Sequence, residues 1–151
     1  MTYPTATDLF LDDFCLGQVA ERRHVIEDAD ILTFAGITGD YSPLHVDDEF
    51  ARRSRFGRRL AHGLLTSSFI TGIIGMELPG RNGIYMSQTL RFRRPVFIGD
   101  EVLVRATMAT IDEEKSRITL ATSCLVDGEV VVDGEALIFV PRRPHSQAPS
   151  S

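Results

Sequence analysis

Residues 63–76 read Gly63-Leu64-Leu65-Thr66-Ser67-Ser68-Phe69-Ile70-Thr71-Gly72-Ile73-Ile74-Gly75-Met76 and form the longest helical candidate in the chain. Apolar residues recur here at intervals of three and four, as on one helix face, but further apolar residues occupy the other faces. A helix that is apolar nearly all round is usually buried. Pro79 and Gly80 then break the pattern. We therefore expect a central helix that other elements cover.

The elements that would cover this helix follow it in the sequence. Strand-like segments are Ile84–Phe92, Glu101–Ile111, Arg117–Val126 and Glu129–Val140. Asp127-Gly128 is a strong hairpin signal between the last two, and Gly134 predicts a bulge. Four long antiparallel strands can curl around one helix and bury it. The pattern predicts an α+β fold with segregated elements.

The residues before this helix predict a turn that carries polar groups. Arg22–Ile26 reads as a first strand, and acids at Glu27–Asp30 suit the start of a helix that Gly39 ends. Pro43 then keeps Ser42 out of the α region, so an extended or turned segment is expected there. Asp47 is a candidate cap for a short helix that follows.

Length and composition indicate one ordinary globular domain. The chain has 151 residues, of which 43% are hydrophobic and 25% charged. We assign residues 10–141 to the domain, 1–9 to a flexible N-terminus and 142–151 to a disordered tail. The N-terminal residues lack the basic region of a signal peptide, and no apolar run is long enough to span a bilayer, so we expect a cytoplasmic protein without membrane contact.

Charge and cysteine content exclude further classes. The net charge of −5 argues against a general nucleic-acid binder. Cys15 and Cys124 make no disulfide framework and have no zinc-like spacing, so we expect neither a disulfide scaffold nor a metal site.

Asp40 and His45 are the first candidates for chemistry, because the turn through Pro43 brings them toward a common point. A carboxylate beside an imidazole can polarise one water molecule from two sides. Histidine also has an ordinary pKa near neutrality, so it can serve as acid or base. Taken alone, a Gly-Asp pair after a helix is usually turn chemistry, and a lone histidine after a proline usually has no catalytic role.

Gly63 strengthens the catalytic interpretation. It begins the central helix, where backbone N–H groups have no partner within the helix and can stabilise negative charge on a carbonyl oxygen. Glycine also lets a substrate approach the backbone closely; the alternative is that Gly63 only permits a tight junction between loop and helix. His62 beside it has a structural role or is a third participant.

Thr38-Gly39-Asp40-Tyr41-Ser42-Pro43-Leu44-His45 followed by Ala61-His62-Gly63 resembles the signature of the MaoC-like, R-specific enoyl-CoA hydratases, also called the hydratase 2 type. The similarity covers about residues 10–141 and includes Phe92–Asp100. It implies a hot-dog fold, in which a curved antiparallel sheet wraps a long central helix. It also implies a homodimer or higher homo-oligomer and a coenzyme A thioester substrate.

By position, the resemblance makes Asp40 and His45 the groups that activate water, and the Gly63 N–H the donor to the thioester oxygen. The implied reaction is syn hydration of trans-2-enoyl-CoA to (R)-3-hydroxyacyl-CoA, without cofactor or metal. The family usually has Asn where this chain has Ser42, and a hydroxyl reaches less far than an amide, so the acyl preference is open. Alternatives are a branched or dicarboxylic substrate of the mesaconyl-CoA type, a thioesterase, and a non-catalytic acyl-CoA-binding subunit.

Other polar residues are candidates for substrate binding. Ser67 and Thr71 lie four and eight residues after Gly63 and would line the acyl pocket, or bond back to helix carbonyls. Five arginines within residues 52–59, and Arg93 near a strand end, suit the phosphates of coenzyme A or an acidic acyl carrier protein. A solvated, ion-paired surface loop is the alternative for these arginines.

Overall fold

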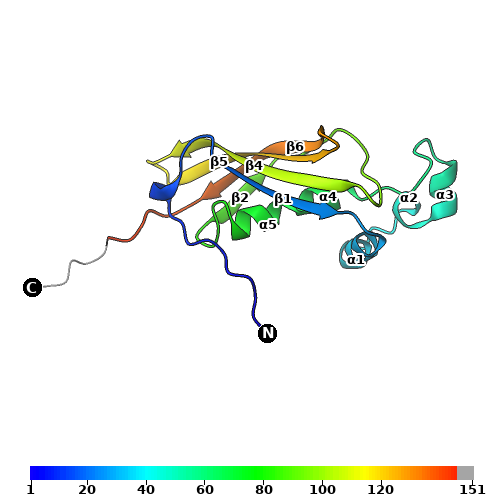
Figure 1. Cartoon of the computed structure of the whole chain (residues 1–151), viewed down its shortest axis with the longest axis horizontal. Coiled ribbons are helices and arrows are strands. Elements are labelled where there is room, and N and C mark those ends of the chain that lie inside the picture. The colour runs from blue at the N-terminus through cyan, green and yellow to red at the C-terminus, as the bar shows by residue number, and fades with distance from the viewer. Residues whose placement is uncertain (146–151) are drawn as a thin grey trace, which may run out of the picture.

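A six-stranded antiparallel sheet dominates the computed structural model, which describes residues 1–145 (Figure 1). The strands are β1 (Val19–Val25), β2 (Ile84–Gln88), β3 (Arg91–Phe92), β4 (Glu101–Asp112), β5 (Arg117–Val126) and β6 (Glu129–Phe139). Their order is β1-β4-β5-β6-β2, and β3 also pairs with β6. The predicted strand Ile84–Phe92 is therefore divided into β2 and β3, while the last three strands lie where they were expected.

The helices lie on one face and at one end of this sheet (Figure 1). They are a short 3₁₀ helix (Leu11–Asp13), α1 (Asp28–Thr38), α2 (Pro43–Val46), α3 (Asp48–Arg53), α4 (Gly63–Ser68) and α5 (Ile70–Met76). Helices α4 and α5 lie against the sheet, and α1, α2 and α3 gather beyond one end of it. No helix within residues 1–145 is long and apolar enough to cross a membrane.

The predicted central helix is present but interrupted at Phe69, between α4 and α5. Hydroxyls in α4 bond back to carbonyls: Ser67 Oγ donates to Leu64 O at 3.1 Å and Ser68 Oγ to Leu65 O at 2.6 Å. Such bonds often bend helices. The expected burial on every side is corrected, because several residues of α4 and α5 are exposed, and Leu64 has a relative exposure of 59%.

The inner face of the sheet supplies most of the core. Alternate residues of β4 are buried there, as the sequence predicted: Val102, Val104, Ala106 and Met108. The turn at Asp127-Gly128 has φ values of 50° and 77°, which fits the predicted two-residue hairpin.

Gly134 itself pairs in register with Thr122, and the bulge predicted near it lies at Val131, which is skipped in the pairing of β6 with β5. A Cβ at Gly134 would stand 1.7 Å from Thr89 O. The glycine is instead required because the segment between β2 and β3 crosses it closely.

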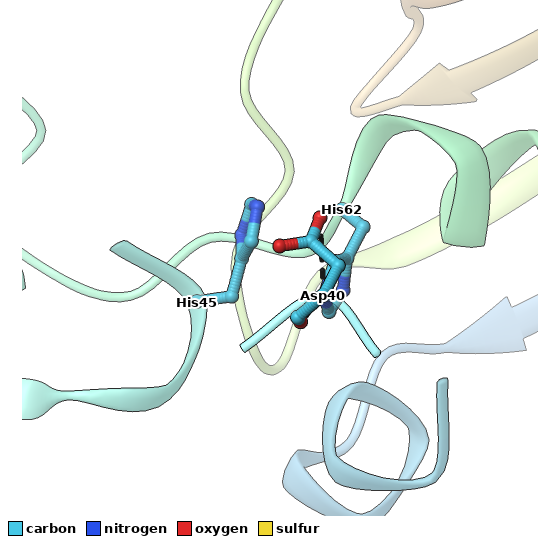
Figure 2. Close-up of side chains that lie close together, drawn as sticks. All are labelled: Asp40, His45 and His62. Carbon is cyan, nitrogen blue, oxygen red and sulfur yellow. Dashed lines mark hydrogen bonds and ion pairs between the residues drawn. The ribbon is translucent and has the colours of Figure 1, made fainter. Parts of the chain in front are cut away.

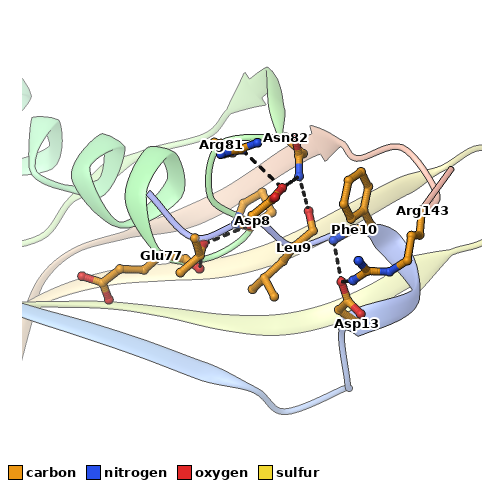
Figure 3. Close-up of polar contacts among 10 residues, drawn as sticks. Asp8, Leu9, Phe10, Asp13, Glu77, Arg81, Asn82 and Arg143 are labelled. Atoms are coloured by element: carbon orange, nitrogen blue, oxygen red, sulfur yellow. Dashed lines mark hydrogen bonds and ion pairs between the residues drawn. The ribbon is translucent and has the colours of Figure 1, made fainter. Parts of the chain in front are cut away.

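The N-terminal segment packs against the end of α5 (Figure 3). Thr7 N donates to Met76 O at 2.9 Å, and Asn82 Nδ2 donates to Asp8 Oδ1 at 2.8 Å. The packed part of the chain thus begins near Thr7, a few residues before the predicted boundary at residue 10.

The described C-terminal residues return to the same region (Figure 3). Arg143 Nη2 donates to Asp13 Oδ2 at 2.6 Å, and the Arg143 guanidinium lies over the Phe10 ring. The sequence predicts a disordered tail from residue 142. The first residues of that tail, however, make contacts with the N-terminal segment. Its last part, residues 146–151, lies outside the described residues.

Candidate active site

Local chemistry of α1 and the following turn places Asp40. Gly39 ends α1 in the left-handed conformation, with φ of 80°, and its N–H donates to Ala35 O. The Ser42 N–H then donates to Asp40 Oδ1 at 3.1 Å, which folds the turn back on the carboxylate. Ser42 is non-helical, as expected, but Pro43 begins the one-turn helix α2 instead of an extended segment.

Helix α2 carries His45 toward Asp40, and α4 brings His62 (Figure 2). Potential ligand atoms of the three side chains all lie within 4.8 Å of one another. His62 Nε2 is 3.9 Å from Asp40 Oδ2, and the two imidazole rings stack with centroids 4.0 Å apart. The structure thus brings together the acid and imidazole of the predicted pair, with His62 behind them.

The tautomer of His45 follows from its hydrogen bond. Its Nδ1 lies 2.8 Å from Leu60 O, which can only accept, so Nδ1 carries the proton of the neutral ring. Nε2 is then the nitrogen with a free lone pair. Arg59 Nε donates to His45 O at 2.6 Å and fixes the backbone of the same residue. His45 is therefore oriented to take a proton at Nε2.

His62 is buried, with 3% relative exposure. Its Nε2 lies 3.0 Å from the backbone oxygen of Asp40, so Nε2 carries the proton. Its Nδ1 is buried without a hydrogen-bond partner among residues 1–145. His62 thus ties the turn of Asp40 to the start of α4 and supports the ring of His45.

A cavity of about 520 Å³ opens beside these groups. Its walls include Asp40, His45, His62, Gly63 and Arg93 from the predicted site. Further lining residues are mostly apolar: Phe34, Phe56, Leu60, Ala61, Leu64, Phe92, Pro95, Val96 and Val132. A mostly apolar cavity with a few convergent polar groups is typical of small-molecule sites.

Gly63 and Phe92 meet at one wall of this cavity. A Cβ at Gly63 would lie 2.7 Å from Phe92 Cδ1, so only glycine leaves room for the ring in this position. Phe92 was not singled out from the sequence, because β3 is only two residues long and gives no clear alternation. Its position depends on the pairing of β3 with β6.

Three of the predicted substrate-binding residues do not line the cavity. Ser42 contributes a backbone N–H to the turn, Ser67 is buried and bonded to a helix carbonyl, and Thr71 is exposed. Arg93 lines the cavity, but its Nε is 2.7 Å from Asp133 Oδ2, so its charge is already paired. The substrate roles of these residues stay predictions.

Asp40, His45 and His62 also have residue types that bind metals, and their ligand atoms are near one another. Imidazole lone pairs lie in the ring plane, however, and these two rings are stacked at an interplanar angle of 29°. Their free nitrogens therefore do not aim at one point, as a metal centre requires. The arrangement suits proton transfer better than metal coordination.

Comparison with known proteins identifies the family of the chain. Residues 17–130 match the family model described as a MaoC like domain. A 3-hydroxybutyryl-CoA dehydratase of Methylorubrum extorquens is 44% identical, over 93% of this chain and 89% of its own length. An (R)-specific enoyl-CoA hydratase of Rhodospirillum rubrum is 41% identical, over 92% of this chain and 99% of its own.

A solved structure gives the same result for the fold. The (R)-hydratase from A. caviae involved in PHA biosynthesis superimposes with a TM-score of 0.83 at 36% identity, covering 85% of this chain and 98% of that one. The predicted hot-dog fold and the predicted enzyme class, a hydro-lyase, are thereby confirmed. The chain belongs to the MaoC-like family of hydratases and dehydratases.

Proposed function

We propose that the protein is an (R)-specific enoyl-CoA hydratase, which adds water reversibly to a trans-2-enoyl-CoA and forms (R)-3-hydroxyacyl-CoA. The observation that carries this proposal is the convergence of Asp40, His45 and Gly63 on one cavity. The cavity offers two groups that exchange protons with water and one backbone N–H for a thioester oxygen.

In the proposed mechanism, His45 Nε2 and Asp40 hold the water and remove its proton while its oxygen adds to C3. The same pair then delivers a proton to C2 on the same face, so water is added syn. Gly63 N–H stabilises the enolate oxygen between these steps, because the first N–H groups of a helix have no partner within it. The proposal needs neither metal nor cofactor, so dialysis against EDTA should leave the rate unchanged.

We infer a short, straight acyl chain, which the name of one relative, a 3-hydroxybutyryl-CoA dehydratase, supports. Proteins at 44% and 41% identity are named for 3-hydroxybutyryl-CoA and enoyl-CoA. A relative from Arabidopsis thaliana at 38% identity is named a 3-hydroxyacyl-[acyl-carrier-protein] dehydratase, which keeps a carrier-protein thioester as the second candidate. A panel of enoyl-CoA esters of different length and branching, including mesaconyl-CoA, would rank these substrates.

We also propose a cytoplasmic location, which cell fractionation tests.

One experiment separates the proposed reaction from its rivals. Crotonyl-CoA is mixed with the protein, and the enoyl absorbance and free thiol are followed together. A hydratase lowers the absorbance without releasing thiol. Thiol release would indicate a thioesterase, and binding without either change would indicate a non-catalytic subunit.

We further propose that the protein is a homodimer joined along β2. This strand ends the sheet and has no neighbour on its outer side within residues 1–145. Ile84 and Met86 on it have relative exposures of 62% and 46%, which is unusual for an uncovered edge. Ile84→Asp should convert the dimer to a monomer in analytical ultracentrifugation, and a monomeric wild-type protein would contradict this assignment.

A further inference from the structure

The five arginines of residues 52–59 do not have equal surroundings. Arg52 and Arg53 both pair with Glu49, at 3.0 and 2.9 Å. Arg59 has a side chain only 10% exposed and pairs with Asp28, besides its bond to the backbone of the site. These three charges are already compensated, so they are not free to bind an anion.

Arg55 and Arg58 differ, because neither makes an ion pair with any residue in the range 1–145. Each lies over an aromatic ring instead: Arg55 Cζ is 4.8 Å from the Phe56 centroid, and Arg58 Cζ is 4.1 Å from that of Phe97. Stacking holds a guanidinium by its face and leaves its N–H edges available. The two arginines are thus held in place but uncompensated.

Both arginines belong to the end of the molecule where the cavity opens. Arg55 lines the cavity and is exposed, which places it at the rim. Leu60, a lining residue, forms a backbone bridge with Phe97, so the segment that carries the ring under Arg58 lies next to this wall. The segments after α3 and after β3 meet there, beside α2 (Figure 1).

The other arginines at this rim, Arg93 and Arg94, are paired with acids. Their partners are Asp133 and Glu129, each at 2.7 Å. The whole chain carries a net charge of −5, so an anionic substrate would gain little from its overall field. Arg55 and Arg58 therefore supply the uncompensated positive charge beside the opening.

We propose that Arg55 and Arg58 bind the phosphate end of the phosphopantetheine arm whose thioester lies at Gly63. This inference rests on the proposed function. A phosphate is the matching ligand, because guanidinium groups present paired N–H donors to its oxygens. The same phosphate occurs in coenzyme A, joined to a nucleotide, and on a carrier protein, joined to a serine.

The test compares crotonyl-phosphopantetheine with crotonyl-pantetheine, which differ only in the phosphate of the arm. For the double variant Arg55→Gln/Arg58→Gln, we expect the ratio of kcat/KM for the phosphopantetheine ester to that for the pantetheine ester to fall at least tenfold. The matched control is Arg52→Gln/Arg53→Gln, which removes the same charge from the same segment and should keep the wild-type ratio. The proposal would be overturned if the first variant kept both the wild-type ratio and wild-type activity toward crotonyl on an acyl carrier protein, or if the control showed an equal fall.

Two further measurements separate the two sources of the phosphate, and they distinguish failure of this proposal from failure of the proposed hydratase function. Crotonyl attached to an acyl carrier protein is a third substrate, and a tenfold loss confined to it would assign the arginines to the carrier-bound phosphate. Turnover of crotonyl-pantetheine by the wild-type protein tests the hydratase function independently of the arginines, because this ester carries no phosphate. If no ester is hydrated, calorimetric binding of coenzyme A still tests them: an affinity in Arg55→Gln/Arg58→Gln equal to that of the wild type would overturn the proposal.

Discussion

Gly63→Ala separates a catalytic from a structural role for this glycine. The added Cβ would stand 2.7 and 2.8 Å from Phe92 Cδ1 and Cε1, whereas ordinary contact begins at 3.4 Å. The Phe92 ring is 54% exposed and can turn toward solvent, so we expect the free energy of unfolding to fall by about 0.5 kcal/mol or less. In the proposed mechanism, the methyl group would crowd a thioester oxygen that approaches the Gly63 N–H. If it blocks that approach, kcat should fall about as much as on loss of such a donor, by roughly 10²–10³, equivalent to about 2.7–4 kcal/mol.

The assays are steady-state hydration of crotonyl-CoA and urea unfolding of the same preparations. Gly75→Ala is the matched control, because no atom lies within 4 Å of its added Cβ. It should keep both activity and stability. A hydration rate for Gly63→Ala within threefold of the wild type would refute the oxyanion role. A fall in unfolding free energy as large as the rise in activation free energy would show that the glycine serves the junction.

Three further outcomes are expected. Gly134→Ala should lower the free energy of unfolding by about 3 kcal/mol in urea, because its Cβ would meet backbone 1.7 Å away. Iodoacetamide should label exposed Cys15 but spare Cys124 in the native protein, because burial raises the pKa of Cys124 to about 12. Burial opposes a low pKa at Asp30, but the Glu27 N–H and His24 lower it below the ordinary 3.8. Because its pKa is lower in the folded protein, ionised Asp30 stabilises the fold above pH 3.8. This stabilisation is lost as the pH falls through the pKa of the folded state. Asp30→Asn should therefore lower the free energy of unfolding in urea more at pH 7 than at pH 3.

Local rules were sufficient for much of the fold. Alternation identified the buried face of β4, and Asp127-Gly128 gave the last hairpin. The ending of α1 at Gly39 and the cap of α3 at Asp47, whose side chain accepts from Phe50 N, also followed from residue type. These features depend on neighbours in the sequence, which is why the sequence alone predicts them.

Features that depend on distant contacts were not predictable. The central helix is interrupted at Phe69, after two serine hydroxyls that bond back to helix carbonyls. The predicted strand over residues 84–92 is divided around Thr89, where the chain crosses close to Gly134. The sequence named Asp40, His45 and Gly63, but the tautomer of His45 depends on a carbonyl fifteen residues away. Similarly, five adjacent arginines look alike until their partners in space are known.

The most direct test of the proposed mechanism replaces Asp40 and His45 one at a time. Asp40→Asn keeps the shape of its side chain, and His45→Gln keeps a side-chain N–H donor, but both remove the capacity to exchange a proton. Positioned acid–base groups contribute roughly 10²–10⁴ in rate. We predict losses of that size in the hydration of crotonyl-CoA, with urea unfolding midpoints close to that of the wild type. Near-normal hydration by both variants would contradict the assignment of these residues as the water-activating pair.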